Sequence, residues 1–208
     1  MTDSELSKKY KKLSPIEHVL LKPGMYIGDI DFHSDRQFIF KNNKIVLENI
    51  SWSPGLYKIF DEIIVNAYDQ NIRDNTLNKI QVEILDDHFI CYNNGIGIDV
   101  EKHPEHKIYI PELIFANLMT STNYNESEER ITGGTHGLGS KLTAIFSKKF
   151  IIEVWDKKRK LYYRQVIEDN LSKINKPEIN KIISGEGGVK ITVYPDFKKF
   201  GKIDKLKN

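Results

Sequence analysis

The chain has 208 residues, enough for one large domain or two small ones, and 39% of them are hydrophobic, which is enough to bury a core. Its 31 lysine and arginine residues balance 29 acidic residues. The formal net charge of +2 therefore predicts neither a uniformly basic nucleic-acid-binding surface nor an acidic tail. Cys91 is the only cysteine, which excludes an intrachain disulfide and is weakly typical of an intracellular protein. No run approaches the roughly 18 apolar residues of a membrane-spanning helix, so we expect no membrane partner.

The first 50 residues predict short elements. Residues 1–15 are polar and rich in lysine, unlike a secretory signal, and we interpret them as an arm. Residues 16–28 have a short helical pattern that ends before Pro23 and is followed by a loop that contains glycine. Residues 36–50 predict two short strands joined by a polar turn at residues 41–43.

The stretch SWSPGLYKIFDEIIVNAYDQNIRDN, residues 51–75, contains the clearest helix pattern. Ser53 is a suitable N-cap residue, and Pro54 then stands at the first helical position, where its missing N–H leaves no hydrogen bond unmade. An apolar stripe follows at the i, i+3, i+4 spacing of a helix that faces a core: Leu56, Ile59, Phe60, Ile63 and Ala67.

The rest of the chain alternates strands and helices. Alternating apolar residues predict a hairpin at 79–97, and further strands at 150–156, 160–169 and 188–196. Helices are predicted at 111–119 and 140–149, on either side of a long polar loop at 120–139, and a polar connection precedes the last strand. Because hairpins dominate the strand pairing, we expect an α+β fold: a two-layer α/β sandwich with a mixed, mostly antiparallel sheet.

Three polar residues, Glu62, Asn66 and Asp69, lie within roughly 60° of one another beside the apolar stripe of the helix. Exposure to solvent is the commoner explanation for any one of them. Asn66 weakens that explanation, since asparagine is a poor helix former in mid-helix. An amide oxygen can ligate Mg²⁺, and a carboxylate one turn earlier can accept a proton from an attacking water.

The stretch Asn93-Asn94-Gly95-Ile96-Gly97 ends the predicted hairpin. Asn-Gly favours a tight turn by itself. The same glycines would also let the backbone approach a flat ligand closely, and the Asn93 side chain could then bond the edge of a base.

A third cluster, GGTHGLGSK at residues 133–141, contains the pattern GxxGxG and opens a helix. Plain flexible loops match such a pattern often. However, a helix N-terminus favours a bound phosphate, and Lys141 in the first turn would suit a helix N-terminus only if an anion were near. The loop is neither a Walker A loop nor a Rossmann turn, because the spacing and the preceding strand are missing.

In this order, the acid and amide on a helix, NNGIG, and GxxGxG with a following lysine resemble the ATP-binding motifs of the GHKL superfamily, which includes DNA gyrase, Hsp90, histidine kinases and MutL. Longer stretches narrow the resemblance to the ATPase domain of eukaryotic-type DNA topoisomerase II. They are YKKLSPIEHVLLKPGMYIG, PGLYKIFDEIIVNAYD, NNGIGI, YIPELIFANLMTSTNY and ITGGTHGLGSKLTAIFS. The resemblance runs from about Tyr10 to about Phe200 and implies the Bergerat fold.

The resemblance also implies roles for individual residues. Glu62 corresponds to the general base, Asn66 to the ligand of Mg²⁺, and Asn93 to the residue that contacts adenine. Tyr10 matches a tyrosine in a strap that crosses to the nucleotide of the partner subunit. Ribose and phosphate contacts are implied for Ser121, Thr122 and Asn123, and phosphate contacts in the lid for Gly134, Thr135, His136, Gly137, Leu138, Gly139, Ser140 and Lys141. His136 and Leu138 depart from the residues that are usual in the family, as does Gln70 after the helix.

The resemblance predicts a domain that binds and hydrolyses ATP with Mg²⁺ in a type IIA DNA topoisomerase. ATP binding would close a homodimeric gate for DNA strand passage, and DNA would bind the full-length protein in the nucleus, or, for a viral protein, at a cytoplasmic replication site or in the virion. We expect an arm at residues 1–15, the ATP-binding domain at 16–200, and at 201–208 the start of a connection to a transducer domain. That domain supplies a lysine to the γ-phosphate in the family, so we expect weak turnover by residues 1–208 alone.

Two alternatives stay open. One is another GHKL ATPase, Hsp90-like or MutL-like, which Asn93 in place of aspartate and the arm near Tyr10 disfavour. The other is a nucleotide-dependent dimerisation module that does not hydrolyse ATP, which Glu62 disfavours because a pure binder needs no base. His103 and His106 are spaced like a weak metal pair, but a structural zinc site needs four ligands. We interpret Trp52 and Trp155 as packing residues.

Overall fold

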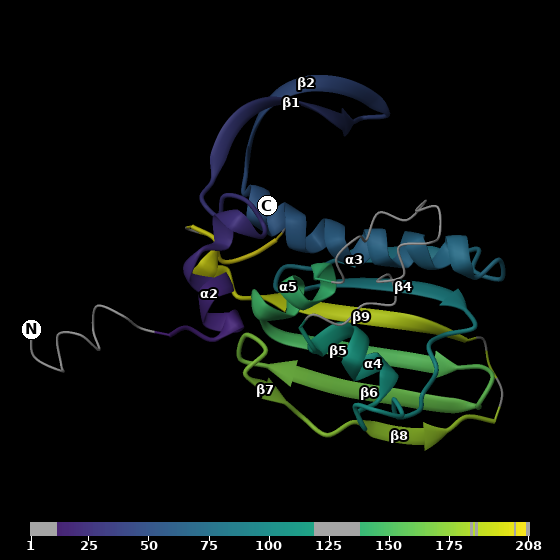
Figure 1. Cartoon of the computed structure of the whole chain (residues 1–208). Helices are drawn as coiled ribbons and strands as arrows, with labels where there is room; N and C mark the ends of the chain where they lie inside the picture. The colour runs from purple at the N-terminus through teal and green to yellow at the C-terminus, as the bar shows by residue number, and fades with distance from the viewer. Residues whose placement is uncertain (1–11, 119–137, 184, 186, 202, 207–208) are drawn as a thin grey trace, which may run out of the picture.

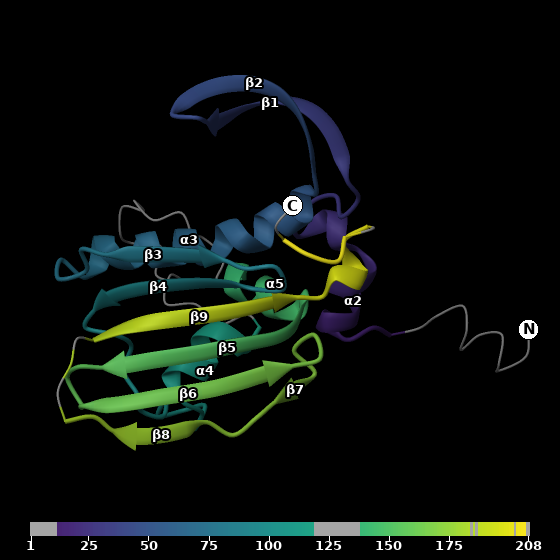
Figure 2. The ribbon, with the colours of Figure 1, turned by 180° about the vertical axis from the view of Figure 1, so that it is seen from behind.

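The computed structural model describes residues 12–118, 138–183, 185, 187–201 and 203–206. Within them, one large antiparallel sheet forms a layer and helices cover one of its faces (Figures 1 and 2). The helices are α2 (Pro15–Leu21), α3 (Pro54–Arg73), α4 (Ile110–Ala116) and α5 (Gly139–Ile145), with 3-10 turns at η1 (Pro23–Met25) and η2 (Phe197–Lys199). The predicted two-layer α/β fold is confirmed. No helix in the described part of the chain is long and apolar enough to cross a bilayer.

The sheet has the strand order β3-β4-β9-β5-β6-β7, and β8 also pairs with β6. All pairings between these described strands are antiparallel. The strands are β3 (Ile80–Ile84), β4 (Phe89–Gly95), β5 (Ser147–Asp156), β6 (Leu161–Glu168), β7 (Lys173–Ile174), β8 (Glu178–Lys181) and β9 (Gly187–Pro195). The last strand is thus inserted between β4 and β5, which brings the end of β4 beside the start of β9.

Helix α3 begins with a side-chain cap and ends at Asp74, whose backbone N–H bonds the Gln70 carbonyl. The Ser53 hydroxyl accepts the N–H of Leu56 at 3.3 Å, and Pro54 stands in the first turn, as predicted. The predicted stripe faces the sheet: Ile59, Ile63 and Ala67 are buried. This packing fixes the rotation of the helix, and therefore also fixes the direction of the polar residues beside the stripe.

The helix-covered face of the sheet carries the core in cross-strand rows. Phe89 of β4 lies opposite Val193 of β9, which lies opposite Phe150 of β5, and all three are buried. Phe60 of α3 meets the Phe89 ring edge to face, with ring centroids 5.1 Å apart. Cys91 is buried on the same face, as expected for a strand residue.

A separate hairpin precedes α3. Strands β1 (His33–Lys41) and β2 (Lys44–Trp52) pair along their whole length, and the ribbon rises away from the sheet (Figure 1). Asn42 and Asn43 both have positive φ, 52° and 61°, which suits a two-residue turn between strands of right-handed twist. The predicted pair of strands around this turn is confirmed.

Two helix boundaries and one connection differ from the prediction. The helix expected at 140–149 ends at Ile145, because the Ser147 hydroxyl bonds the Thr143 carbonyl at 2.5 Å and the chain then enters β5. The helix expected at 111–119 ends at Ala116. The polar connection before the last strand contains β7 and β8, whose mostly exposed side chains lack the alternation that marks a half-buried strand.

Candidate functional site

The Glu62 carboxylate lies at the contact between α3 and α5. A Cβ atom added to Gly139, the first residue of α5, would stand 1.7 Å from Glu62 Oε2, so only glycine fits against this carboxylate. The Thr143 hydroxyl ties the two helices together by donating to the Ile59 carbonyl at 2.9 Å. Two residues predicted to serve one site, 77 positions apart, are therefore brought together by the fold.

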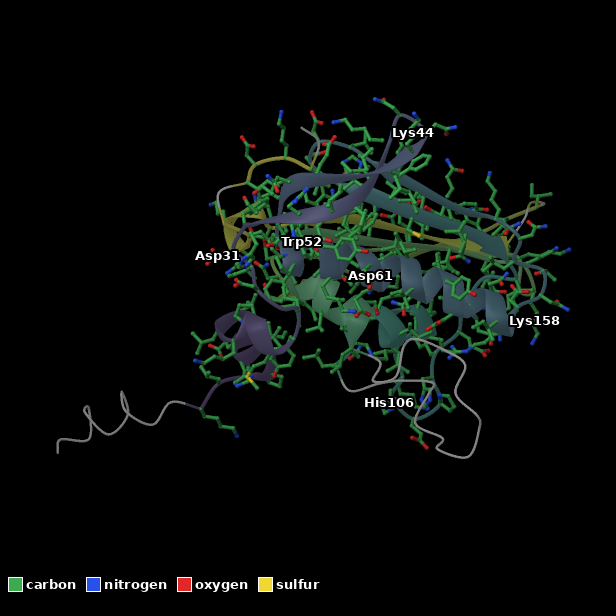
Figure 3. The ribbon with its side chains drawn as sticks, turned by 90° about the horizontal axis from the view of Figure 1, so that it is seen from above. Asp31, Lys44, Trp52, Asp61, His106 and Lys158 are labelled. Carbon is green, nitrogen blue, oxygen red and sulfur yellow. The ribbon has the colours of Figure 1, made fainter. Side chains whose placement is uncertain are left out.

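Glu62 is held by a lysine one turn earlier. Lys58 Nζ lies 2.6 Å from Glu62 Oε1 and 3.5 Å from Asp61 Oδ2. The Glu62 side chain is only 18% exposed, and hydrogen bonding to it raises the pKa of Lys58 above the ordinary value. The ion pair fixes the direction of the carboxylate, whereas the side chain of neighbouring Asp61, labelled in Figure 3, is 35% exposed.

Asn66 follows Glu62 by one turn and is half-buried. Its side chain makes no hydrogen bond within the part of the chain that the structure describes. An amide oxygen in this position can ligate a hard cation such as Mg²⁺. Asp69 is buried, and it takes part in an interaction of its own. The alternative that Asp69 simply meets solvent is thus wrong.

Asn93 lies near the end of β4, on the same face of the sheet as Phe89 and Cys91. It is buried, and its amide nitrogen donates to the Asn94 carbonyl at 3.0 Å, whereas its amide oxygen accepts no hydrogen bond from a described residue. Asn94 has a structural role, since its side-chain oxygen accepts the N–H groups of Asn78 and Lys79. The side chains of Asn93 and Asn94 therefore lie on opposite faces of the sheet.

Asp74 is an anchor of the site that the sequence pattern did not reveal. It caps the C-terminus of α3, and its carboxylate accepts the Ile96 N–H at 2.7 Å and the Thr76 hydroxyl at 2.6 Å. Burial alone would raise the pKa of Asp74, but the hydrogen bonds from Thr76 and Ile96 outweigh it and hold the pKa below its ordinary value. Asp74 thus fastens the loop after Asn93 to the helix that carries Glu62.

Glycines allow the close approach of strands at this end of the sheet. A Cβ atom at Gly95 would stand 2.3 Å from Asp74 Oδ2, and one at Gly97, where φ is +81°, would stand 2.2 Å from the Trp155 carbonyl. In β9, a Cβ atom at Gly187 would stand 2.3 Å from the Gly95 carbonyl oxygen, and one at Gly188 would stand 2.6 Å from the Asn93 carbonyl oxygen. The glycine-rich end of the polar connection therefore lies directly beside Asn93 in the sheet.

At the start of α5 the first N–H groups have no partner within the helix, as at any helix N-terminus. Ser140 and Lys141 in this first turn are both buried. Burial lowers the pKa of Lys141 to about 8. The side chain has a partner in the structure, so its charge is not isolated.

Comparison with known proteins identifies relatives. A scan against models of protein families finds no match to the chain. DNA topoisomerase 2 of Plasmodium falciparum is 44% identical over 205 residues, which cover 94% of the chain, and that of Arabidopsis thaliana is 44% identical over 197 residues, again 94%. The ATPase region of Saccharomyces cerevisiae topoisomerase II superposes with a TM-score of 0.94 at 39% identity, covering 97% of the chain and 54% of that structure.

The chain belongs to the GHKL-type ATPase domains of the eukaryotic type II DNA topoisomerase family. The ATPase and transducer domains of Balamuthia mandrillaris DNA topoisomerase II agree, with a TM-score of 0.94 at 37% identity over the whole chain. The 43K ATPase domain of Thermus thermophilus gyrase B has a TM-score of 0.66 at 20% identity, which indicates a shared fold alone. The chain spans 15% and 13% of the two curated relatives, which are much longer proteins.

Several residues assigned by resemblance to the topoisomerase family lie outside the described residues. These are Tyr10, Ser121, Thr122, Asn123, Gly134, Thr135, His136 and Gly137. Leu138, just before α5, is within the described residues; its side chain is partly buried and packs against the core. The roles of all these residues stay predictions.

The histidine pair lies apart from the family's motifs. His103, Glu105 and His106 bring their ligand atoms within 4.8 Å of one another on a surface turn. However, Nδ1 of His103 already accepts the N–H groups of Glu105 and His106, at 3.3 and 3.4 Å. The other nitrogen of a neutral ring is then protonated, so His103 offers no free lone pair to a metal.

Proposed function

We propose that this chain is the ATP-binding and ATP-hydrolysing domain of a type IIA DNA topoisomerase. In the whole protein, binding of ATP would close a homodimeric gate through which a DNA segment passes. The observation that carries this proposal is the contact of the Glu62 carboxylate with the first residue of α5, because it joins a base to a helix N-terminus suited to phosphates.

The proposed pocket has three walls. The polar edge of α3 supplies Glu62 and Asn66, the end of β4 supplies Asn93, and the start of α5 supplies its N–H groups and Lys141. The adenine would lie toward Asn93, whose buried amide can bond the edge of a base. The phosphates would lie at α5, where the helix dipole and the charge of Lys141 favour anions.

In the proposed reaction, Glu62 accepts a proton from a water molecule as the water oxygen bonds to the γ-phosphorus. The bond from that phosphorus to the bridging oxygen breaks, and ADP leaves. Lys58 holds the carboxylate in one direction through the 2.6 Å ion pair. Asn66, with its oxygen donor and no hydrogen bond to another described residue, fits a ligand of Mg²⁺, which would neutralise charge on the phosphate oxygens.

The decisive test compares Glu62→Gln with Asp61→Asn, a neighbouring acid that also lies near Lys58. Binding is measured by titrating the 208-residue chain with a fluorescent ATP analogue. Hydrolysis is measured under single-turnover conditions with the chain in excess, which detects the slow rate that we expect from residues 1–208 alone. Glu62→Gln should bind within a few-fold of the parent and hydrolyse at least about 100-fold more slowly, the usual contribution of a general base. Asp61→Asn should change both by less than about threefold.

Two outcomes would contradict the proposal. Unchanged hydrolysis by Glu62→Gln would mean that Glu62 is not the base. Tight binding of ATP without hydrolysis by the parent, both as the 208-residue chain and in the full-length protein, would favour a nucleotide-dependent module that does not hydrolyse ATP.

A further inference from the structure

A surface cleft of about 550 Å³ lies between the loop before α4, the first turn of α4 and the segment that enters β8. Figure 1 shows α4 in front of the sheet, with β8 along the edge of the sheet. His106, labelled in Figure 3, belongs to the loop before α4. The polar residues that line the cleft are Lys102, Lys107, Tyr109, Glu112 and Lys176. We call it the lysine cleft.

Three lysines from two distant parts of the chain meet at the lysine cleft. Lys102 and Lys107 come from the loop before α4, and Lys176 comes from the connection between β7 and β8. None of the three forms an ion pair with a described residue, whereas Lys173 and Lys190 form ion pairs at 2.7 and 2.6 Å. Three like charges around one cleft repel one another, and a bound anion would remove that repulsion.

The loop before α4 holds two of these lysines in place. The backbone of Lys102 pairs with that of Tyr109, and Lys102 Nζ lies 5.5 Å from the centroid of the Tyr109 ring. Lys107 has a φ of +59°, which is uncommon for a residue with a side chain, and its N–H donates to the His103 carbonyl at 2.9 Å. The backbone from which both side chains extend is therefore fixed.

The acid of the lysine cleft is bonded to the interior of the protein. Gln165, which is 1% exposed, donates from Nε2 to Glu112 Oε2 at 2.6 Å and to the Asn175 carbonyl at 3.0 Å. The Tyr163 hydroxyl donates to the Gln165 side-chain oxygen at 2.6 Å. The same buried amide thus holds both walls of the cleft. Three positive charges and one negative charge leave its lining with a net charge of +2.

This charge and this size indicate a small ligand with several negative charges. Phosphate groups supply that charge, and lysine binds them as a compact point charge. The volume is within the range of small-molecule pockets and exceeds the space that one phosphate fills. A nucleic-acid duplex presents its phosphates along a broad surface instead, and would need a longer basic stripe than this cleft offers.

We propose that the lysine cleft binds a small compound with two or more phosphate groups, at a site separate from the nucleotide pocket. Lys102, Lys107 and Lys176 bond the phosphate oxygens, while Gln165 keeps Glu112 directed toward the interior. The lysine cleft shares no residue with the nucleotide pocket proposed above, so this proposal does not depend on that one.

The test is a titration of the isotope-labelled 208-residue chain with inorganic pyrophosphate, followed by the backbone amide signals in NMR spectra. In the parent, the signals of residues 102–109 and 175–179 should shift together and saturate. The double variant Lys102→Gln with Lys176→Gln should weaken this binding at least about tenfold, because each lost lysine removes a charge-assisted hydrogen bond. The matched control is Lys44→Gln with Lys198→Gln, which removes two exposed lysines elsewhere and should bind as the parent does.

A variant with the opposite sign sharpens the test. Glu112→Gln removes the negative charge of the cleft and keeps an oxygen that can accept from Gln165, so it should tighten pyrophosphate binding about two- to fivefold. Unchanged amide signals outside the cleft show that each variant is folded. Signals of residues 139–142 report separately on pyrophosphate in the nucleotide pocket, so the two sites can be told apart.

Three outcomes would overturn the proposal. The first is the absence of shifts at residues 102–109 and 175–179 up to millimolar pyrophosphate. The second is equal affinity in the parent and in the double lysine variant. The third is a response of these signals to a short DNA duplex but not to pyrophosphate, which would make the cleft part of a nucleic-acid surface.

Discussion

Helix α3 and the β1–β2 hairpin are neighbours in sequence but treat their apolar residues in opposite ways. The hairpin ends at Trp52 and the helix begins at Pro54. In the helix, the apolar stripe is buried against the sheet, and Ile59 has no exposed surface. In the hairpin, Phe38, Phe40 and Ile45 are 75%, 72% and 74% exposed.

The difference shows how much each element contributes to the stability of the fold. The burial of α3 is complete within the chain, and this fixed orientation aims Glu62 at α5 and leaves Asn66 beside it. The hairpin buries little within the chain, so its apolar residues contribute little to the stability of the fold. Substitutions in the two elements should therefore differ in how much they change the free energy of unfolding.

The largest expected effect contrasts two isoleucines. Ile59→Ala should reduce the free energy of unfolding by about 2–5 kcal/mol, because it removes buried methylene groups and leaves a cavity under α3. Ile45→Ala at the hairpin tip should change it by less than about 0.5 kcal/mol. Urea unfolding of dilute chain, followed by circular dichroism, measures both.

The contrast fails if Ile45→Ala destabilises the dilute monomer as strongly as Ile59→Ala does. The hairpin would then be part of the cooperative core, and its exposed face would need another explanation. Leu47→Ala, on the same face of the hairpin but less exposed, should lie close to Ile45→Ala and checks that result.

A second prediction extends the comparison to the other end of α3. Asp74→Asn should reduce the free energy of unfolding by about 1–3 kcal/mol, because it weakens buried hydrogen bonds to Ile96 and Thr76. Because the folded state lowers the pKa of Asp74, its stabilising contribution is present above the unfolded pKa, about 3.9, and is lost as the pH falls through the folded pKa. Stability of the parent should thus fall more steeply than that of the variant below about pH 4.

The control for this prediction is Asp31→Asn, an exposed acid near the base of the hairpin. It should change the free energy of unfolding by less than about 0.5 kcal/mol. If Asp74→Asn also followed the parent, the hydrogen bonds of Asp74 would contribute nothing to the fold, and the loop after Asn93 would be held by strand pairing alone.

Local patterns were sufficient to predict some parts of the site. The cap at Ser53 and the stripe predicted α3 and the side on which Glu62 and Asn66 lie, and alternation predicted β4 up to Asn93. Asp74 could not be found in this way, because its partner Ile96 is 22 positions away and only the fold brings them together. The same holds for Gly187 and Gly188, whose need for a missing side chain comes from a neighbouring strand.

The exposure of the hairpin could not be predicted from the sequence either. The residues at 38–40 and 45–47 are apolar on both faces of the ribbon, so alternation cannot say which face is buried. The short strands β7 and β8 carry mostly exposed, polar residues and pair only at the edge, so they lack the signal by which strands are predicted. In each case, a tertiary contact decides what the local pattern leaves open.

The smallest expected effect concerns Lys141 at the start of α5, beside the Glu62 contact. Its pKa is lowered to about 8 by burial, so its positive charge is lost as the pH rises through about 8. If the charge helps to bind the phosphates of ATP, affinity should fall up to about tenfold between pH 7.5 and pH 9, since about nine in ten lysines are then neutral. Unfolding does not explain such a loss: with a folded pKa below the unfolded value of about 10.4, this group makes the fold more stable, not less, as the pH rises over that range.

Titration with the fluorescent ATP analogue at fixed magnesium measures the effect. Lys141→Met should bind more weakly at pH 7.5 and show a flat profile, whereas Lys44→Met at the exposed hairpin tip should follow the parent. An equally steep profile in Lys141→Met would assign the pH dependence to another group and remove Lys141 from the proposed phosphate site.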